Sequence, residues 1–120
     1  MAERSRSILV VDNDPDSADS LALLLEYWNH HVCVAYDGEQ AIEVFRKQSP
    51  AIVLLDIGLP DLDGYEVARR LRKEPHRAIL VALTGFGEDR DRIAAQEAGF
   101  DHHFVKPVDV KVLQNLIVTA

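Results

Sequence analysis

Three uninterrupted apolar runs divide the chain, and each of them ends at a polar side chain. The runs are residues 8–11, 51–55 and 78–83, and the polar residues that end them are Asp12, Asp56 and Thr84. Short apolar runs bounded by turn residues are typical of strands that are buried on both faces. Two mixed runs, 31–36 and 102–106, predict shorter strands at the edges of the same sheet.

Between these runs, apolar residues recur at the three- and four-residue spacing of helices. The expected helices are 15–28, 39–48, a segment from Gly64 to before Pro75, 88–98, and a segment after Asp109. Asp14 and Asp109 are expected to cap the first and the last of these helices. In the last helix, Val110, Leu113 and Ile117 are expected to face inward. The helix at 88–98 has Ile93 as its only large apolar residue, which predicts weak anchoring.

Strand and helix therefore alternate five times, with short connections. This alternation predicts an α/β fold with a five-stranded parallel sheet and helices on both faces. The order 2-1-3-4-5, that of a flavodoxin-like, doubly wound fold, satisfies the expectation that the three apolar strands are central. In such a sheet, ligands bind beyond the carboxyl ends of the first and third strands, where Asp12, Asn13 and Asp56 lie.

Composition limits the classes of partner. A length of 120 residues fits one domain, with residues 1–7 as a polar tail and 8–120 as the folded domain. The net charge of −7 argues against binding to nucleic acid or to an anionic membrane. No apolar stretch approaches the length of a transmembrane helix, and the polar start does not resemble a signal peptide. We therefore expect a cytoplasmic protein.

The residues at the strand ends predict a chemistry. Asp12 and Asp56 are expected to lie close together, and such a pair of carboxylates favours a cation. Hard oxygen ligands without His or Cys favour Mg²⁺. Thr84 and Lys106 would add a hydroxyl and an ammonium to the same crevice. Together these groups predict a site that holds a phosphoryl group on Asp56, with the carboxylate as nucleophile.

Several short motifs resemble those of one family. They are Val10-Val-Asp12, Leu54-Leu-Asp56-Ile-Gly-Leu-Pro60, Asp63-Gly64, Ala82-Leu-Thr84 and Val105-Lys106-Pro107. Together they resemble the signature of response-regulator receiver domains, over nearly the whole chain. The segments 17–25 and 100–103 are most similar to receivers attached to hybrid histidine kinases.

The resemblance implies a function. Asp56 would accept a phosphoryl group from the phosphohistidine of a histidine kinase or a histidine phosphotransfer protein. Asp12 and the carbonyl of Gly58 would help Asp56 to hold Mg²⁺, and Thr84 and Lys106 would contact the phosphoryl group. A cis peptide bond before Pro107 is also implied. Such a domain assists only its own phosphorylation and dephosphorylation, and is not otherwise an enzyme.

Two residues depart from the family pattern. Asn13 stands where receivers usually have a second acid that ligates the metal, so we expect weaker binding of Mg²⁺, although the amide oxygen can still coordinate. Asp14 is expected to cap the helix rather than replace that acid. His103 stands where a Tyr or Phe commonly switches together with the residue matched by Thr84, and we expect His103 to take this switching role.

Other interpretations stay open. A degenerate receiver that acts as an unphosphorylated binding module is the main alternative, because Asn13 weakens the metal site. A haloacid-dehalogenase-like phosphatase would need a second acid where this chain has Gly58, and a flavin carrier would need a phosphate loop where this chain has acidic residues.

The pairs at 30–31 and 102–103 are expected to be surface or edge histidines. The basic run at 69–73 is expected to be a solvated helix face.

Overall fold

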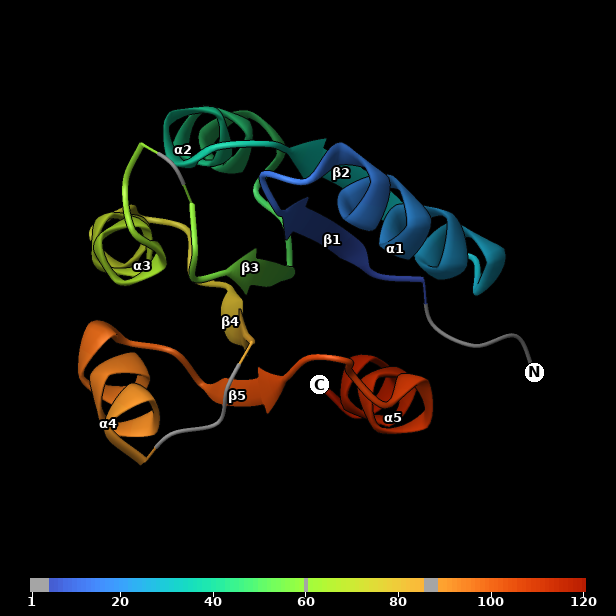
Figure 1. Cartoon of the computed structure of the whole chain (residues 1–120). Helices are drawn as coiled ribbons and strands as arrows, with labels where there is room; N and C mark the ends of the chain where they lie inside the picture. The colour runs from blue at the N-terminus through green and yellow to red at the C-terminus, as the bar shows by residue number, and fades with distance from the viewer. Residues whose placement is uncertain (1–4, 60, 86–88) are drawn as a thin grey trace.

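The computed structural model describes residues 5–59, 61–85 and 89–120, in which five strands alternate with five helices (Figure 1). The strands are β1 (Ser7–Val11), β2 (His31–Ala35), β3 (Ile52–Asp56), β4 (Ile79–Thr84) and β5 (His102–Val105). The helices are α1 (Pro15–Tyr27), α2 (Gly38–Gln48), α3 (Gly64–Arg72), α4 (Asp89–Ala98) and α5 (Val110–Thr119). Each predicted element is present, with ends that differ by one or two residues. Glu88, predicted to begin the fourth helix, lies outside the described residues.

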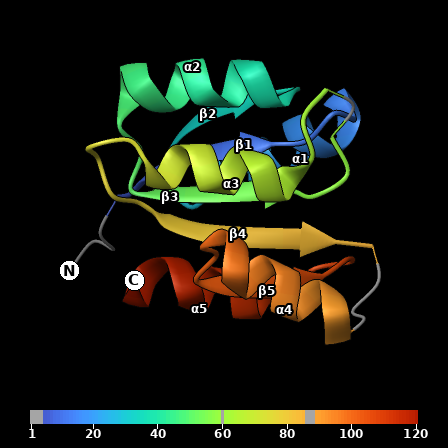
Figure 2. The ribbon, with the colours of Figure 1, turned by 90° about the vertical axis from the view of Figure 1, so that its left-hand side faces the viewer.

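The strands form one parallel sheet in the predicted order β2-β1-β3-β4-β5. In Figure 2 the strands run in the same direction, so that their carboxyl ends share one edge of the sheet. The register places Asp56 beside Leu83 and Thr84 beside Val105. The last residues of β3 and β4 therefore lie close together at this edge, where ligands bind in sheets of this topology.

Helices cover both faces of the sheet (Figure 1). On one face, α2, α3 and α4 bury a core that includes Phe45, Leu71 and Ala95 against inward residues of the strands. On the other face, α1 and α5 bury Leu25, Leu113 and Ile117. The central strands supply fully buried side chains to both cores, which explains their unbroken apolar sequence.

Aspartates begin four of the helices. Asp14, Asp37, Asp63 and Asp109 each accept a hydrogen bond from a backbone N–H of the first turn. These bonds satisfy donors that have no partner inside the helix. The predicted caps at Asp14 and Asp109 are confirmed.

Two apolar helix residues, Val110 in α5 and Ile93 in α4, are exposed rather than buried. The prediction that Val110 faces inward is wrong, because this side chain is 49% exposed. The first three residues of α5 are exposed, and the helix contacts the sheet only from Leu113 onward. In α4, Ile93 is 56% exposed, and the helix packs instead through Ala95 and Ala98. Two alanines bury little area, which agrees with the weak anchoring expected for this helix.

His30 is not the surface or edge residue that was predicted. Its side chain is 5% exposed, and Nδ1 accepts a hydrogen bond from the backbone N–H of Arg6 at 3.0 Å. The reason is the turn before it: Asn29 has a φ of 70°, and the N–H of His30 then donates back to the carbonyl of Leu25. The chain folds His30 under the end of α1, whereas His31 and His102 are exposed.

Arg72 departs from the predicted solvated face of α3. Its guanidinium donates to the carbonyls of Gly99 and Ala78 and to the carboxylate of Asp101, at 2.6–2.8 Å, and its side chain is only 16% exposed. Burial would raise the pKa of Asp101, but hydrogen bonds from the Leu80 N–H and from Arg72 outweigh it and lower that pKa. Arg72 thereby joins the end of α3 to the start of β5.

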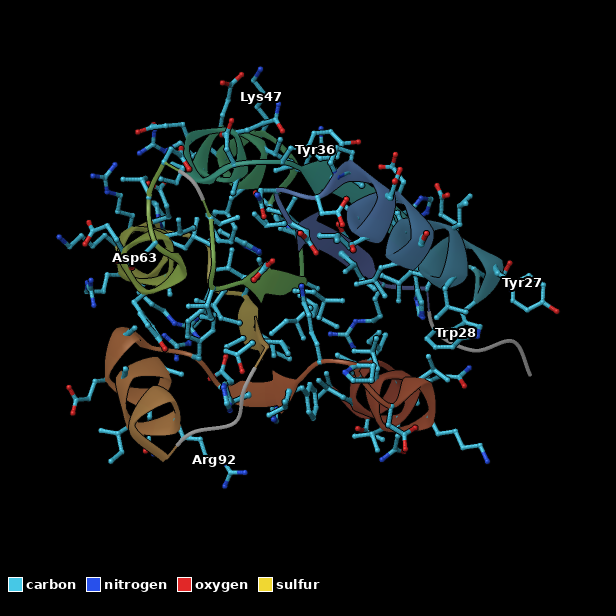
Figure 3. All side chains as sticks on the ribbon, viewed as in Figure 1. Tyr27, Trp28, Tyr36, Lys47, Asp63 and Arg92 are labelled. Carbon is cyan, nitrogen blue, oxygen red and sulfur yellow. The ribbon has the colours of Figure 1, made fainter. Side chains whose placement is uncertain are left out.

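The far end of α1 carries two aromatic residues in different environments. Figure 3 shows Tyr27 extending away from the helix, and this side chain is 82% exposed. Trp28 is half-buried and packs against the core between the sheet, α1 and α5. In the part of the chain that the structure describes, none of the helices combines the length and apolar character needed to cross a bilayer.

Candidate functional site

Four polar residues lie at the carboxyl edge of the sheet because each one ends a strand or directly follows one. Asp12 follows β1, Asp56 ends β3, Thr84 ends β4 and Lys106 follows β5. The N–H of Asp12 donates to the carbonyl of Ala35 at the end of β2, which holds this residue at the edge of the sheet. The sequence prediction that these residues converge is therefore supported by their positions in the fold.

Lys106 joins the two carboxylates directly. Its Nζ lies 3.2 Å from Oδ2 of Asp12 and 3.1 Å from Oδ2 of Asp56. One ammonium between two carboxylates leaves the group with one net negative charge. A charge of this sign on poorly exposed side chains favours a further cation.

Backbone donors orient the second oxygen of each carboxylate. Oδ1 of Asp12 accepts from the N–H of Asp14 at 2.9 Å, and Oδ1 of Asp56 accepts from the N–H of Gly58 at 3.0 Å. The side chains of Asp12 and Asp56 are 9% and 15% exposed. Each carboxylate is therefore held by a fixed backbone donor on one side and by Lys106 on the other.

The protonation state of Lys106 follows from two opposed effects. Burial is the largest single effect and by itself would lower the pKa of the ammonium. Hydrogen bonds and charges from Asp56 and Asp12 together outweigh burial and raise the pKa above its ordinary value. Lys106 is therefore a fixed positive charge at neutral pH.

The oxygen atoms at this edge fit the ligand preference of Mg²⁺. Asp12 and Asp56 supply hard carboxylate oxygens. Asn13 follows Asp12 directly, Gly58 lies two positions after Asp56, and both are exposed. Within residues 5–59, 61–85 and 89–120, no three acids, histidines or cysteines gather into a group that could hold a metal. Asn13, next to Asp12, is an amide and not an acid. The donor set fits Mg²⁺ with two carboxylates.

Asp14 does not supply the missing acid. Its carboxylate accepts from the N–H of Asp16 at 3.1 Å and from the hydroxyl of Ser17 at 3.0 Å. Both oxygens thus serve the start of α1, as predicted.

Thr84 contacts His103 on the neighbouring strand. Its Oγ1 lies 3.2 Å from Nε2 of His103, and Thr84 is buried with 6% exposure. His103 is half-buried on β5, in the strand next to the end of β4. The pair predicted to switch together is therefore in contact. The peptide bond before Pro107 is cis, as the family resemblance implied.

Sequence reasoning did not anticipate how closely α3 packs on the backbone behind Asp56. A Cβ on Gly64 would lie 2.6 Å from Cα of Ile57 and 3.1 Å from the carbonyl oxygen of Asp56. The N–H of Gly64 donates to the carbonyl of Ile57 at 2.9 Å. The sequence alone predicts a turn at Asp63-Gly64. The three-dimensional packing shows in addition that Gly64 holds the loop after Asp56 in place.

Comparison with known protein families gives one match over nearly the whole chain. The family model described as "Response regulator receiver domain" matches residues 8–118. Among curated proteins, "Probable transcriptional regulator ycf27" of Pyropia yezoensis is 41% identical over 114 residues, which cover 95% of this chain and 46% of the relative. An "Uncharacterized 14.6 kDa protein in sodA1 3'region" of Leptolyngbya boryana is 37% identical, over 92% of this chain and 86% of the relative.

Solved structures share the fold. A "putative response regulator" from Chloroflexus aurantiacus superposes with a TM-score of 0.88 at 30% identity and covers 95% of both chains. The chain spans about half the length of the transcriptional regulators that it matches.

Proposed function

This chain belongs to the family of response regulator receiver domains, and we propose that its Asp56 accepts a phosphoryl group from the phosphohistidine of a histidine kinase or a histidine phosphotransfer protein. The observation that carries the proposal is the ammonium of Lys106, held between Asp56 and Asp12 at 3.1 and 3.2 Å. A nucleophilic carboxylate beside a fixed cation is the arrangement that phosphoryl transfer requires.

In the proposed step, a carboxylate oxygen of Asp56 forms a bond to phosphorus while the phosphorus–nitrogen bond of the phosphohistidine breaks. The imidazole leaves with the electron pair of that bond. The N–H of Gly58 orients the Asp56 carboxylate, and Lys106 is close enough to pair with an oxygen of the transferred group. Asp12, Asp56, Asn13 and the carbonyl of Gly58 are the groups that would hold Mg²⁺, which when bound neutralises charge on the phosphoryl oxygens.

The same site would act as a switch. Thr84 now bonds to His103, and we propose that its hydroxyl turns to the phosphoryl group when Asp56 is modified, so that His103 changes its rotamer. This change would bias the surface formed by α4, β5 and α5. The small anchoring area of α4 supports the idea that this surface moves at low cost.

We also propose a role for the larger protein to which this domain would belong. The chain would promote its own phosphorylation and dephosphorylation and no other reaction. Several of the relatives are named as transcriptional regulators and are about twice as long as this chain, which supports a role in gene regulation within a larger protein. Attachment to a hybrid histidine kinase stays a prediction from sequence. The comparisons give no support to the degenerate, unphosphorylated module.

Incubation with acetyl phosphate, with and without Mg²⁺, tests the proposal by intact mass. We expect a gain of one phosphoryl group that depends on Mg²⁺ and is absent from Asp56→Asn, which keeps the shape of the side chain. Asn13→Asp should lower the concentration of Mg²⁺ that gives half the maximal rate, because it adds a charged ligand. A chain that gains no mass under any of these conditions would contradict the proposal.

A further inference from the structure

The loop between β3 and α3 reaches across to a different helix. Figures 1 and 2 both show this loop rising beside the N-terminal end of α2. Asp61 makes the connection: its Oδ1 accepts from the N–H of Gly38 at 2.8 Å, and its Oδ2 accepts from the N–H of Glu39 at 3.0 Å. From its sequence context alone, Asp61 is expected only to form a turn between Asp56 and Gly64.

The two N–H groups that Asp61 binds are the first two of α2. Such donors have no partner inside a helix, and they lie at its positive end, where a carboxylate is favoured. Asp37, the N-cap of the same helix, binds the N–H of Gln40 instead. Asp37 and Asp61 thus cap α2 together. Asp37 directly precedes the helix, whereas Asp61 comes from the loop that follows Asp56.

Packing around Gly38 shows how close this contact is. A Cβ at position 38 would lie 2.9 Å from Cγ2 of Val67, 3.0 Å from Cβ of Leu62 and 3.2 Å from Oδ1 of Asp61. A side chain at position 38 would therefore push the loop away from α2. The hydrogen bond from Gly38 is also the main reason that the pKa of Asp61 is lowered, against a smaller opposing effect of burial.

The loop held in this way contains Gly58. Its N–H fixes Oδ1 of Asp56, and its carbonyl is one of the oxygens proposed to hold Mg²⁺. The start of the loop is tied at Ile57, whose carbonyl accepts from Leu59 and Gly64. Asp61 ties the far side of the same loop to α2.

We infer that Asp61 is a positioning residue for the phosphoryl site, because its carboxylate holds the loop that places Gly58 beside Asp56. The inference rests on the proposed function only for its effect on phosphorylation. The predicted effect of Asp61 on the backbone of Gly58 does not depend on the proposed function, because it is measured in the protein without metal or phosphodonor.

Hydrogen exchange of the Gly58 amide in the metal-free chain, followed by NMR, is the direct test. We expect Asp61→Ala to speed this exchange about tenfold and to raise the half-saturating concentration of Mg²⁺ for phosphorylation by a similar factor. The matched control is Asp37→Ala, which removes a capping bond at the same end of α2 but leaves the loop contact intact. This control should leave both quantities within about twofold of wild type. Asp61→Asn retains the size of the side chain and should act in the same direction.

Equal exchange of Gly58 in the Asp61 variants and in wild type, or an equal increase in the Asp37 control, would overturn the inference. If Asp61→Ala does not fold, Asp61→Asn provides the same comparison. If wild type takes no phosphoryl group, the proposed function fails, while the exchange of Gly58 still decides the role of Asp61.

Discussion

Replacing Lys106 with methionine removes the charge that separates two carboxylates while keeping most of the side-chain volume. Oδ2 of Asp12 and Oδ2 of Asp56 each lie within 3.2 Å of the same nitrogen, so these oxygens can be no further apart than twice that distance. Two unit charges about 6 Å apart repel by about 3 kcal/mol at an effective dielectric constant of about 20, and by about 0.7 kcal/mol in bulk water.

Each of these energies is the smallest repulsion at its dielectric constant, because the two oxygens can also lie closer together, and two effects reduce the cost of the substitution. The side chain of Lys106 is 35% exposed, so solvent screens part of the interaction, and removing the buried ammonium also removes its desolvation cost. We therefore predict that Lys106→Met lowers the free energy of unfolding of the metal-free chain by about 2 kcal/mol. Saturating Mg²⁺ should reverse most of this loss, because a bound cation restores the charge balance.

Urea unfolding, followed by Trp28 fluorescence, measures the free energy of unfolding with and without Mg²⁺. Trp28 suits this purpose because it is half-buried in the core and lies at the end of α1 away from the site. Lys111→Met is the matched control, because Lys111 is exposed on α5, and it should change stability by less than about 0.5 kcal/mol. If Lys106→Met costs the same with and without Mg²⁺, the reasoning that Lys106 balances the two carboxylates is wrong.

Three further predictions concern the frame around the site. Arg72→Ala should lower the free energy of unfolding by about 3 kcal/mol, measured in urea, because it leaves the Gly99 carbonyl and the Asp101 carboxylate without their buried donor. Folding lowers the pKa of Asp101, so its carboxylate stabilises the fold fully at a pH above the ordinary aspartate pKa. This contribution to the free energy of unfolding is lost as the pH falls through the pKa of Asp101 in the folded protein. Asp101→Asn should therefore make the free energy of unfolding depend less steeply on pH in the acid range. Gly64→Ala should cost about 2 kcal/mol by forcing the Ile57 backbone to move, and should slow phosphorylation in the same assay as wild type.

The fold was predictable because its main signals are local. Unbroken apolar runs mark strands that are covered on both faces, and the aspartates before the helices mark where the helices begin. The convergence of Asp12, Asp56, Thr84 and Lys106 then follows from strand order alone, since parallel strands deliver their ends to one edge.

Residues whose role depends on a distant partner were not predictable in this way. Arg72 has the spacing of a solvated residue on α3, and its burial depends on carbonyls 6 and 27 positions further along the chain. Asp61 looks like a turn former, and its partners Gly38 and Glu39 begin helix α2, more than 20 positions earlier in the chain. The exposure of Val110 likewise depends on where α5 first meets the sheet, which helical periodicity does not specify.

Locating the phosphoryl group on the chain tests the central claim most directly. After reaction with acetyl phosphate and Mg²⁺, reduction with borohydride converts an acyl phosphate to an alcohol, and peptide mass spectrometry identifies the position. The account predicts a single reduced residue at position 56, beside the Lys106 ammonium. Modification at Asp12, Asp14 or Asp61 in place of Asp56, or no modified peptide at all, would contradict it.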